Sequence, residues 1–396
     1  MKRNVLYILL VLAMAIASCT PKAAPTTPAP VVTEAPTVEV VVATTAPVCA
    51  GPIKEAIIAA MTGTNAILGD YIQKAVTLAI EQKNAAGGIN GCPIELIVYD
   101  DAADPTTSVG LAQKVATSDN VMAAWATSNS SSALADIPIF QQYKIPQMTF
   151  GTNVTITQKG SAYIFRSCPA GPAYEDPLVD YLVKTKGFTK FAIIGDNAAY
   201  GKGEADYQTA ALLRNNLTPL DREEYGIDDK DFTGQLTKIM QSQPEVILLA
   251  ASEVAGGLIA KQARALGFVG VLGGGSGMAS TKFTETAGAD AEGVYFTSPY
   301  PGNDYNAATK AFAAAYLARW GVVAELHGAN VYDGQNMIML AMERADPLTA
   351  ENVAAELHKV CGYEGLLGTF CYDETGEGIK TTHVGIIQGG IQTFLP

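Results

Sequence analysis

The chain has 396 residues and a formal net charge of −13 at pH 7, with 39 acidic and 26 basic side chains. This length exceeds what one small core needs and is sufficient for two domains. The acidic balance argues against a nucleic acid partner, because a negative surface repels the phosphate backbone. The three His are far apart and have no Cys or His neighbours at metal-ligand spacing, so neither a metal nor another cofactor is expected.

Residues 1–18 are a predicted secretory signal peptide. Lys2 and Arg3 precede an apolar run, 5–17, that is too short to span a bilayer comfortably. Ile16-Ala17-Ser18-Cys19 resembles a lipobox, so we expect Cys19 to be lipidated; the alternative is an ordinary signal peptide with a chance Cys. No other stretch is suited to span a membrane, so the lipid would be the only membrane contact. Cleavage leaves 24 basic and 39 acidic residues and a net charge of −15.

Residues 19–51 form a predicted tether between the lipid anchor and the folded part. The stretch 20–47 is rich in Pro, Thr, Ala and Val, has no Gly and has few charges. Such a sequence cannot bury a core, and we expect it to be extended and solvated.

From residue 53 onward, short apolar runs alternate with helical patterns, which predicts parallel sheets with crossover helices. In the first half we expect strands at 56–61, 94–99, 121–126 and 147–150, and helices at 70–84, 107–116 and 130–143. The pattern then restarts, with strands at 190–195, 219–225, 246–250, 269–272 and 294–297, and helices at 201–215, 231–241 and 253–266. Helices at 307–320 and 329–345 and a strand at 384–387 follow. The predicted fold class is α/β, with two Rossmann-like lobes of the flavodoxin type.

In a doubly wound sheet, a ligand binds beyond the carboxyl ends of the strands, where the strand order reverses. With the common order 2-1-3-4-5, this point lies between the loops that follow the first and third strands. These loops are 62–69 and 127–132 in the first lobe, and 196–200 and 251–254 in the second. Two such crevices facing each other predict one cleft between the lobes.

With Cys19 assigned to a lipid, five cysteines remain that can pair outside the cytoplasm. Cys361 and Cys371 flank a Gly-rich segment, 362–369, that can double back and bring them together. Cys49 and Cys92 precede two strands that are neighbours in the predicted sheet. They are the second expected disulfide, which leaves Cys168 outside both pairs.

An ordered series of short motifs runs from Gly51 to Gly390. Its members are Met61-Thr62-Gly63, Asn84-Ala85-Ala86-Gly87-Gly88-Ile89-Asn90-Gly91, Tyr99-Asp100-Asp101 with Asp104-Pro105, Ser130 with Ala135 and Pro138, Phe165-Arg166, Tyr200-Gly201-Lys202-Gly203, Asp229-Lys230-Asp231-Phe232, Gln262-Ala263-Arg264, Ala291-Glu292-Gly293-Val294 and Tyr332-Asp333. As an ordered set, they make the chain similar to the leucine/isoleucine/valine-binding protein family of type I periplasmic binding proteins.

The resemblance implies two lobes joined by three crossing segments. We expect lobe 1 at 52–170 and 299–380, and lobe 2 at 171–298 and 381–396. It further implies that the chain captures a small-molecule ligand (an amino acid, amide or small carboxylate) outside the cytoplasm and delivers it to an ABC permease complex. We expect the protein to be a monomer.

The resemblance also implies ligand-contacting residues. Ser130 matches the family serine that holds the ligand carboxylate, at a helix start that offers free N–H groups; the alternative is that a serine there only caps the helix. Gly151 and Thr152 follow the fourth strand, where the family uses a carbonyl and a Thr hydroxyl, although this chain is one residue shorter there. Tyr200 matches the family's ligand-contacting tyrosine. Leu68 lies in the first loop, where relatives place an aromatic residue. Ordinary packing or loop roles are the alternatives.

Other positions depart from the family pattern. Ser276 stands where relatives that bind amino acids use an acidic residue to neutralise the ammonium group, and Ser252 replaces an aromatic residue. A buried ammonium without a counter-charge costs on the order of several kcal/mol. Either Glu253 takes over this charge or the ligand has no free ammonium, and Glu253 has the alternative of a helix-start carboxylate. His327 aligns near the hinge side of the pocket, with a structural role as its alternative.

No catalytic pattern accompanies these residues, since the sequence has no Gly-x-Ser-x-Gly elbow, no P-loop and no suggestive Cys/His pair. We therefore expect a binding protein rather than an enzyme. The alternatives are a ligand-sensing module for a partner signalling receptor and a hydrolase, which would need a nucleophile and a base facing the cleft.

Overall fold

The computed structural model describes residues 49, 51–127, 129–378 and 381–395, which all belong to one compact unit. The predicted signal peptide, Cys19 and most of the predicted tether lie outside the described residues. Among the helices that are described, none is long and apolar enough to cross a membrane.

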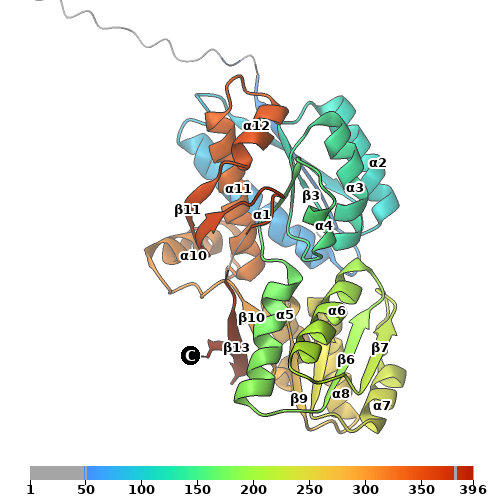
Figure 1. Ribbon diagram of the computed structural model, residues 1–396. Helices are drawn as coiled ribbons and strands as arrows, with labels where there is room; N and C mark the ends of the chain where they lie inside the picture. The colour runs from blue at the N-terminus through green and yellow to red at the C-terminus, as the bar shows by residue number, and fades with distance from the viewer. Residues whose placement is uncertain (1–48, 50, 128, 379–380, 396) are drawn as a thin grey trace, which may run out of the picture. The chain divides into compact units, whose positions relative to one another are not determined.

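The first half of the chain forms a five-stranded parallel sheet in the order β2-β1-β3-β4-β5, in the blue and green part of Figure 1. The predicted strand order 2-1-3-4-5 is therefore confirmed in this lobe, and its fifth strand is one that the sequence did not reveal. The strands are β1 Ile53–Ala59, β2 Ile94–Asp100, β3 Ala123–Ala126, β4 Gln147–Thr149 and β5 Ile164–Arg166.

Strand β1 shows why this sheet is buried on both faces. Ala56 and Ile58 pack with Phe140 of α3, whereas Ile57 and Ala59, which point to the opposite face, share a core with α1 and α11. Helices on both faces require strands that are apolar throughout, as β1 is. The helices of this part are α1 Ala66–Ala85, α2 Pro105–Lys114, α3 Ser130–Tyr143, α4 Thr155–Gln158, α10 Ala307–Trp320, α11 Leu326–Arg344 and α12 Ala350–Leu357.

The second sheet repeats the same winding and then extends it. Its order is β14-β13-β10-β9-β8-β6-β7, so β6 to β10 again follow the order 2-1-3-4-5, and β13 adds antiparallel to β10. The strands are β6 Phe191–Asp196, β7 Asp221–Tyr225, β8 Val246–Ala250, β9 Val271–Gly274, β10 Tyr295–Ser298, β13 His383–Gln388 and β14 Ile391–Phe394. The helices are α5 Gly171–Asp180, α6 Ala199–Arg214, α7 Thr233–Gln241, α8 Glu253–Ala265 and α9 Thr281–Ala287.

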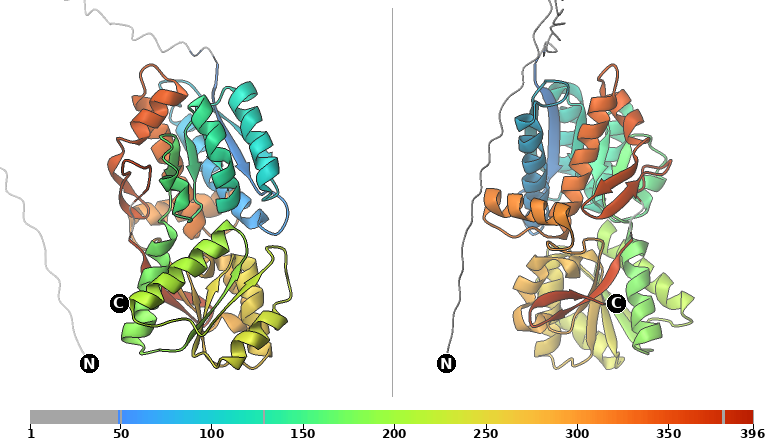
Figure 2. Two further views of the ribbon diagram at one scale, coloured as in Figure 1. Left: turned by 45° about the vertical axis from the view of Figure 1, so that its right-hand side comes forward. Right: turned by 90° about the vertical axis from the view of Figure 1, so that its left-hand side faces the viewer.

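The chain passes between the two sheets in three segments. It crosses between β5 and α5, between β10 and α10, and between β12 (Gly368–Cys371) and β13. Figure 2 shows the orange and red helices beside the blue α1, and the dark red β13 in the other sheet. This connectivity is that of the type I periplasmic-binding-protein fold, as predicted. The division of the lobes at the individual residues named above stays a prediction.

Several helices begin earlier than the sequence predicts, because their capping residues lie upstream of the apolar pattern. Asp104 accepts a hydrogen bond from Thr107 N (2.7 Å) and starts α2, and the Glu325 carboxylate caps α11. Helix α1 begins four residues before the predicted start, so Leu68 lies in its first turn, and the prediction that it lies in a loop was wrong. Helix α5 was missed because Pro172 and Pro177 interrupt its helical pattern.

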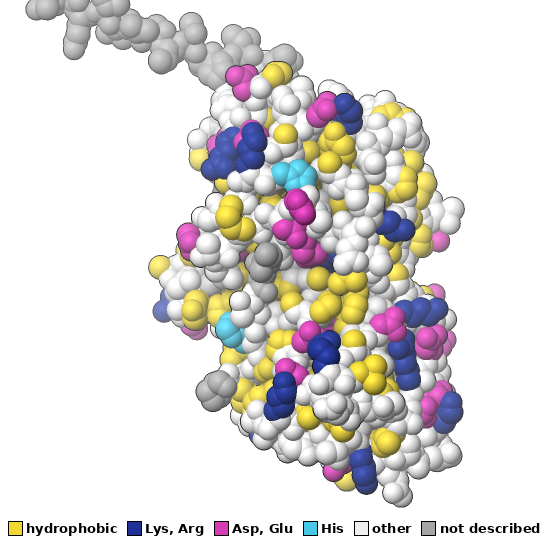
Figure 3. Space-filling view, in the orientation of Figure 1, with side chains coloured by type: hydrophobic (Ala, Val, Ile, Leu, Met, Phe, Trp, Pro, Cys, Tyr) yellow, Lys and Arg dark blue, Asp and Glu magenta, His cyan; other side chains and the backbone are white. Residues whose placement is uncertain are grey.

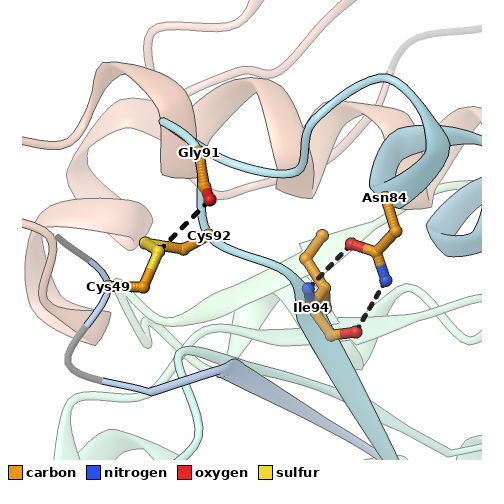
Figure 4. Close-up of a disulfide and its surroundings, with 5 residues drawn as sticks. All are labelled: Cys49, Asn84, Gly91, Cys92 and Ile94. Atoms are coloured by element: carbon orange, nitrogen blue, oxygen red, sulfur yellow. Dashed lines mark hydrogen bonds between the residues drawn. A yellow bond between two sulfur atoms is a disulfide. The ribbon is translucent and has the colours of Figure 1, made fainter. Parts of the chain in front are cut away.

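Two disulfides join the expected cysteine pairs. Cys49 and Cys92, with Cα atoms 5.5 Å apart, tie the chain ahead of β1 to the turn ahead of β2 (Figure 4). Beside this bond, the Asn84 amide donates to Ile94 O (2.9 Å) and accepts from Ile94 N (2.8 Å), which joins the end of α1 to the start of β2. The second disulfide joins the strands β11 (Cys361–Gly365) and β12 of a two-stranded sheet.

Charged side chains on the face shown in Figure 3 are interspersed, with Lys and Arg beside Asp and Glu on both lobes. Ion pairs among the described residues include that of Lys238 with Glu223. This face has no extended basic surface of the kind that binds a phosphate backbone.

Candidate functional site

Loops at the carboxyl ends of the strands enclose a cavity between the two sheets. The empty space among its lining atoms, including the opening to solvent, is about 750 Å³. The structure brings all nine residues predicted to contact a ligand to its walls: Leu68, Ser130, Gly151, Thr152, Tyr200, Ser252, Glu253, Ser276 and His327. That they bind a ligand stays a prediction.

The start of α3 presents hydrogen-bond donors to this cavity. Asn129, not a serine, caps the helix, since its side chain accepts from Ser132 N (2.9 Å). Ser130 therefore does not cap the helix. Among the described residues, its hydroxyl oxygen accepts one long bond, from Asn153 N (3.4 Å), and its proton has no acceptor, so it can be donated to a ligand. The unpaired N–H groups of a first helical turn add a partial positive charge, which favours a carboxylate or another acceptor.

The loop after β4 is held by Arg166, a fully buried side chain at the end of β5. Its guanidinium donates to the carbonyl oxygens of Gly151 and Asn153 (2.8 Å for the latter), while Nε donates to Glu377 (2.9 Å). Thr152 lies between these two carbonyls and is 5% exposed. Arg166 therefore holds the backbone on both sides of Thr152 and fixes the position of this residue in the cavity wall. The sequence placed Arg166 in a family motif but did not identify this role.

Thr152 in turn contacts the second lobe. Its hydroxyl donates to Glu204 Oε1 on α6, and the neighbouring Asn153 amide donates to Ala199 O at the start of that helix (2.7 Å). Elsewhere Tyr71 and Ser280 share a hydrogen bond (3.2 Å) between α1 and the second lobe. The two lobes are thus in direct hydrogen-bonded contact around the cavity.

Tyr200 lies in the first turn of α6, directly across from Ser276. Its hydroxyl lies 3.5 Å from Ala251 O and hydrogen-bonds with Ser276, which lines the cavity from the turn after β9. Burial raises the pKa of Tyr200 well above its ordinary value, so the hydroxyl stays protonated and remains a donor. The ring and the hydroxyl therefore offer a ligand one apolar face and one polar edge.

His327 is held between two buried carboxylates. Its Nδ1 lies 2.9 Å from Glu325 Oε2 and its Nε2 lies 3.5 Å from Glu253 Oε1. The ring stacks on Tyr71, with centroids 5.3 Å apart and planes 7° from parallel. Glu325 also accepts from His327 N and Gly328 N, so it is compensated by the helix start that it caps.

Burial and the neighbouring charges shift the pKa values in this charge triad, Glu253, His327 and Glu325, in opposite directions. Burial lowers the pKa of His327, but the Glu325 carboxylate and its hydrogen bond, together with Glu253, outweigh burial and raise it. Burial raises the pKa of Glu253, which the positive charge of His327 opposes. Glu253 is also the first residue of α8, so the helix-start and cavity-facing interpretations are both correct in position.

Eleven further residues line the cavity beyond the nine that were named individually from the sequence. Five of them lie in loops that were predicted to line the cleft: Asn65, Asn129, Ser131, Asp196 and Ala198. Asp196 ends β6, and its burial raises its pKa to about 6. The other six come from helices, strand ends and loops that no motif marks. The full set is Asn65, Asn129, Ser131, Phe150, Cys168, Tyr174, Asp196, Ala198, Tyr225, Ile227 and Asn330.

Within residues 49, 51–127, 129–378 and 381–395, no three His, Cys, Asp or Glu side chains are grouped so that they could hold a metal ion.

A cavity with polar and apolar walls, enclosed between two doubly wound lobes, is typical of a solute-binding protein. Residues 52–390 match the family described as periplasmic binding protein, and the chain belongs to this family. Its members bind solutes outside the cytoplasm and are not enzymes.

Relatives narrow the family to leucine/isoleucine/valine-binding proteins. Leu/Ile/Val-binding protein homolog 3 of Brucella melitensis is 29% identical over 323 residues, 81% of this chain and 87% of that protein. The leucine-specific-binding protein of Salmonella typhimurium is 27% identical over 340 residues, 86% of this chain and 91% of that protein. The crystal structure of the leucine binding protein LivK of Thermotoga maritima has a TM-score of 0.80 at 27% identity, covering 87% of this chain and 98% of that one.

Proposed function

We propose that this chain is the solute-binding component of an ABC importer, anchored outside the cytoplasm by a lipid on Cys19 and monomeric. In this role it captures a small polar organic ligand, of the amino acid or amide type, in the cavity between its lobes and closes on it by a hinge motion.

The observation that carries the proposal is the position of Ser130. Ser130, which is 1% exposed and lines the cavity, combines a hydroxyl that is available to donate with the N–H groups of the first turn of α3. This combination fits the carboxylate or amide oxygen of a small ligand. The names of the relatives point to leucine, isoleucine and valine as ligands of those proteins, which supports amino acids as the first class to test.

The hydrogen bonds between the lobes support closure. Opening the cavity requires the bonds of Thr152 to Glu204, Asn153 to Ala199 and Tyr71 to Ser280 to break. A ligand that contacts both lobes stabilises the closed arrangement by as much as its extra affinity for it.

A ligand screen tests the proposal. Thermal unfolding is measured with amino acids, amides and small acids; a ligand at a hundred times its Kd stabilises the protein by about 2.7 kcal/mol. For the best ligand, Ser130→Ala is expected to weaken binding by about tenfold to a hundredfold through one lost charge-assisted hydrogen bond of roughly 1.5–3 kcal/mol. The exposed Ser118→Ala is the matched control.

No stabilisation by any member of the panel, or unchanged binding in Ser130→Ala, would contradict binding at this site. The importer role is tested separately, by uptake of the labelled ligand into cells with and without the chain. Equal uptake by both would contradict that role.

A further inference from the structure

The Thr152 hydroxyl has a single proton, and that proton is already used. It is donated to Glu204 Oε1, a carboxylate that is 2% exposed and lies behind Thr152 as seen from the cavity. A hydroxyl whose proton is committed has only lone pairs left for a further partner. Towards the cavity, Thr152 therefore acts as an acceptor and needs a donor from the ligand.

Glu204 is one of two carboxyls packed together beneath the cavity. Glu175 of α5 faces it and accepts from Gln208 Nε2 (3.0 Å). Two glycines make room for the pair. A Cβ at Gly171 would lie 2.8 Å from Glu204 Oε1, and one at Gly275 would lie 2.6 Å from Glu175 Oε1. A larger residue at either position would require the neighbouring carboxyl side chain to shift.

Glu175 and Glu204 differ in how strongly each holds its proton. Burial raises the pKa of Glu175 well above its ordinary value, and the neighbouring Glu204 raises it further. Burial raises the pKa of Glu204 to about 7, with the hydrogen bonds from Thr152 and Glu175 and the charge of Arg166 acting in the opposite direction. Glu175 thus keeps its proton, and Glu204 is the member that ionises and accepts from both neighbours.

Glu253, the other candidate for a counter-charge to a ligand ammonium, already lies beside a partner, His327. The His327 imidazole Nε2 lies 3.5 Å from its carboxylate, and Glu325, 2.9 Å from the other ring nitrogen, raises the pKa of His327 and so favours the charged form of the ring. A carboxylate beside an imidazole that favours its charged form attracts a ligand ammonium less strongly than a carboxylate without such a neighbour.

We propose that Glu204, acting through Thr152, supplies the counter-charge for a ligand ammonium, replacing the carboxylate that relatives carry at the position of Ser276. This inference rests on the proposed function and specifies its ligand. The cavity would then bind a zwitterionic ligand in one orientation. Its carboxylate would accept hydrogen bonds from Ser130, and its ammonium would donate to the Thr152 hydroxyl. Glu204 is a positioning residue, because it acts on the ligand through Thr152.

Calorimetry with paired probes tests the assignment. Each amino acid that binds is compared with the hydroxy acid of the same side chain, for example L-leucine with leucic acid, so that only the amine is exchanged. We expect the wild type to prefer the amino acid by at least about tenfold, and Glu204→Gln, which keeps the shape and removes the charge, to reduce that preference by about tenfold. Asp206→Asn is the matched control, because Asp206 lies on the same helix but pairs with Arg222 at the surface (2.6 Å).

A double-mutant cycle separates this role from a general effect on folding. If Glu204 acts through Thr152, Thr152→Val removes the same preference, and adding Glu204→Gln to it has no further effect. Equal or tighter binding of the hydroxy acid by the wild type, or a preference that survives Glu204→Gln, would overturn the inference and leave the proposed function intact. Binding of neither probe type by the wild type would reject both.

Discussion

Because Glu55 is buried and its pKa is raised, we expect its contribution to the stability of the protein to be lost as the pH rises. This side chain lies in β1 and is 1% exposed, and both of its carboxylate oxygens accept from Gln335 Nε2, at 3.0 and 2.8 Å. Gln335 Oε1 accepts from Trp125 Nε1 (2.8 Å), so the three residues join β1, β3 and α11. The first turn of α11 places His327 at the cavity. Glu55 is therefore linked to the cavity through its hydrogen bonds to Gln335 of the same helix.

The sign follows from the direction of the shift. Burial raises the pKa of Glu55 from 4.5 to about 7, with the Gln335 hydrogen bond opposing. The folded state then holds this proton to a higher pH than the unfolded chain does. The corresponding stability is complete below about pH 4.5 and is lost as the pH rises through about 7. A difference of about 2.5 in pKa corresponds to roughly 3 kcal/mol, at up to about 1.4 kcal/mol per pH unit.

The free energy of unfolding in urea, measured from about pH 5 to about pH 8, checks this prediction. We expect Glu55→Gln to flatten the decline by about 1.4 kcal/mol per pH unit, which is the contribution of one proton. The exposed Glu95→Gln on the adjacent strand β2 is the control, and its slope should match the wild type. Other buried carboxyls, such as Asp136, titrate equally in all three proteins and cancel in the comparison. Identical slopes for Glu55→Gln and the wild type would refute the reasoning.

Three further predictions concern the charge triad, the second disulfide and the anchor. His327→Gln should lower the free energy of unfolding by roughly 3–5 kcal/mol, because it leaves two buried carboxylates without their cation; adding Glu253→Gln should restore part of the loss in urea denaturation, and no recovery would count against the pairing. Replacing both Cys361 and Cys371 by Ser should cost about 2.7 kcal/mol in the loop-entropy model for a separation of 10 residues; peptide mapping that finds free thiols at both positions in the wild type would contradict this. Cys19→Ala should release the protein from the membrane fraction or leave it unprocessed, whereas a wild type that is already soluble and unacylated would exclude the anchor.

The centres of the sheets were predictable because strands such as β1, β6 and β8 are buried on both faces and therefore appear as apolar runs. Strand β8 and helices α3 and α10 have the predicted bounds, and the strand order follows from the common winding. The same topology brings loops that are far apart in sequence to one edge, which is why Ser130, Tyr200 and Ser276 line one cavity. The errors include β5 and α5, which were not predicted, and several helix starts, where caps such as Asp104 and Glu325 matter more than periodicity.

Glu204 was harder to find, because a glutamate in a helix is ordinarily a solvent-exposed residue. A signal was nevertheless present in α6, where Glu204 and Gln208 are four residues apart on the stripe that also carries Leu212. Two polar side chains on the buried stripe of an amphipathic helix need partners inside the protein. The helical pattern shows that Glu204 is buried but not what it meets, since Thr152 is 52 residues away and belongs to the other lobe. For a residue that acts on a ligand through a contact between lobes, the sequence can thus indicate that the side chain is buried. Its hydrogen-bond partner, and therefore its role, can be identified only from the arrangement of both lobes.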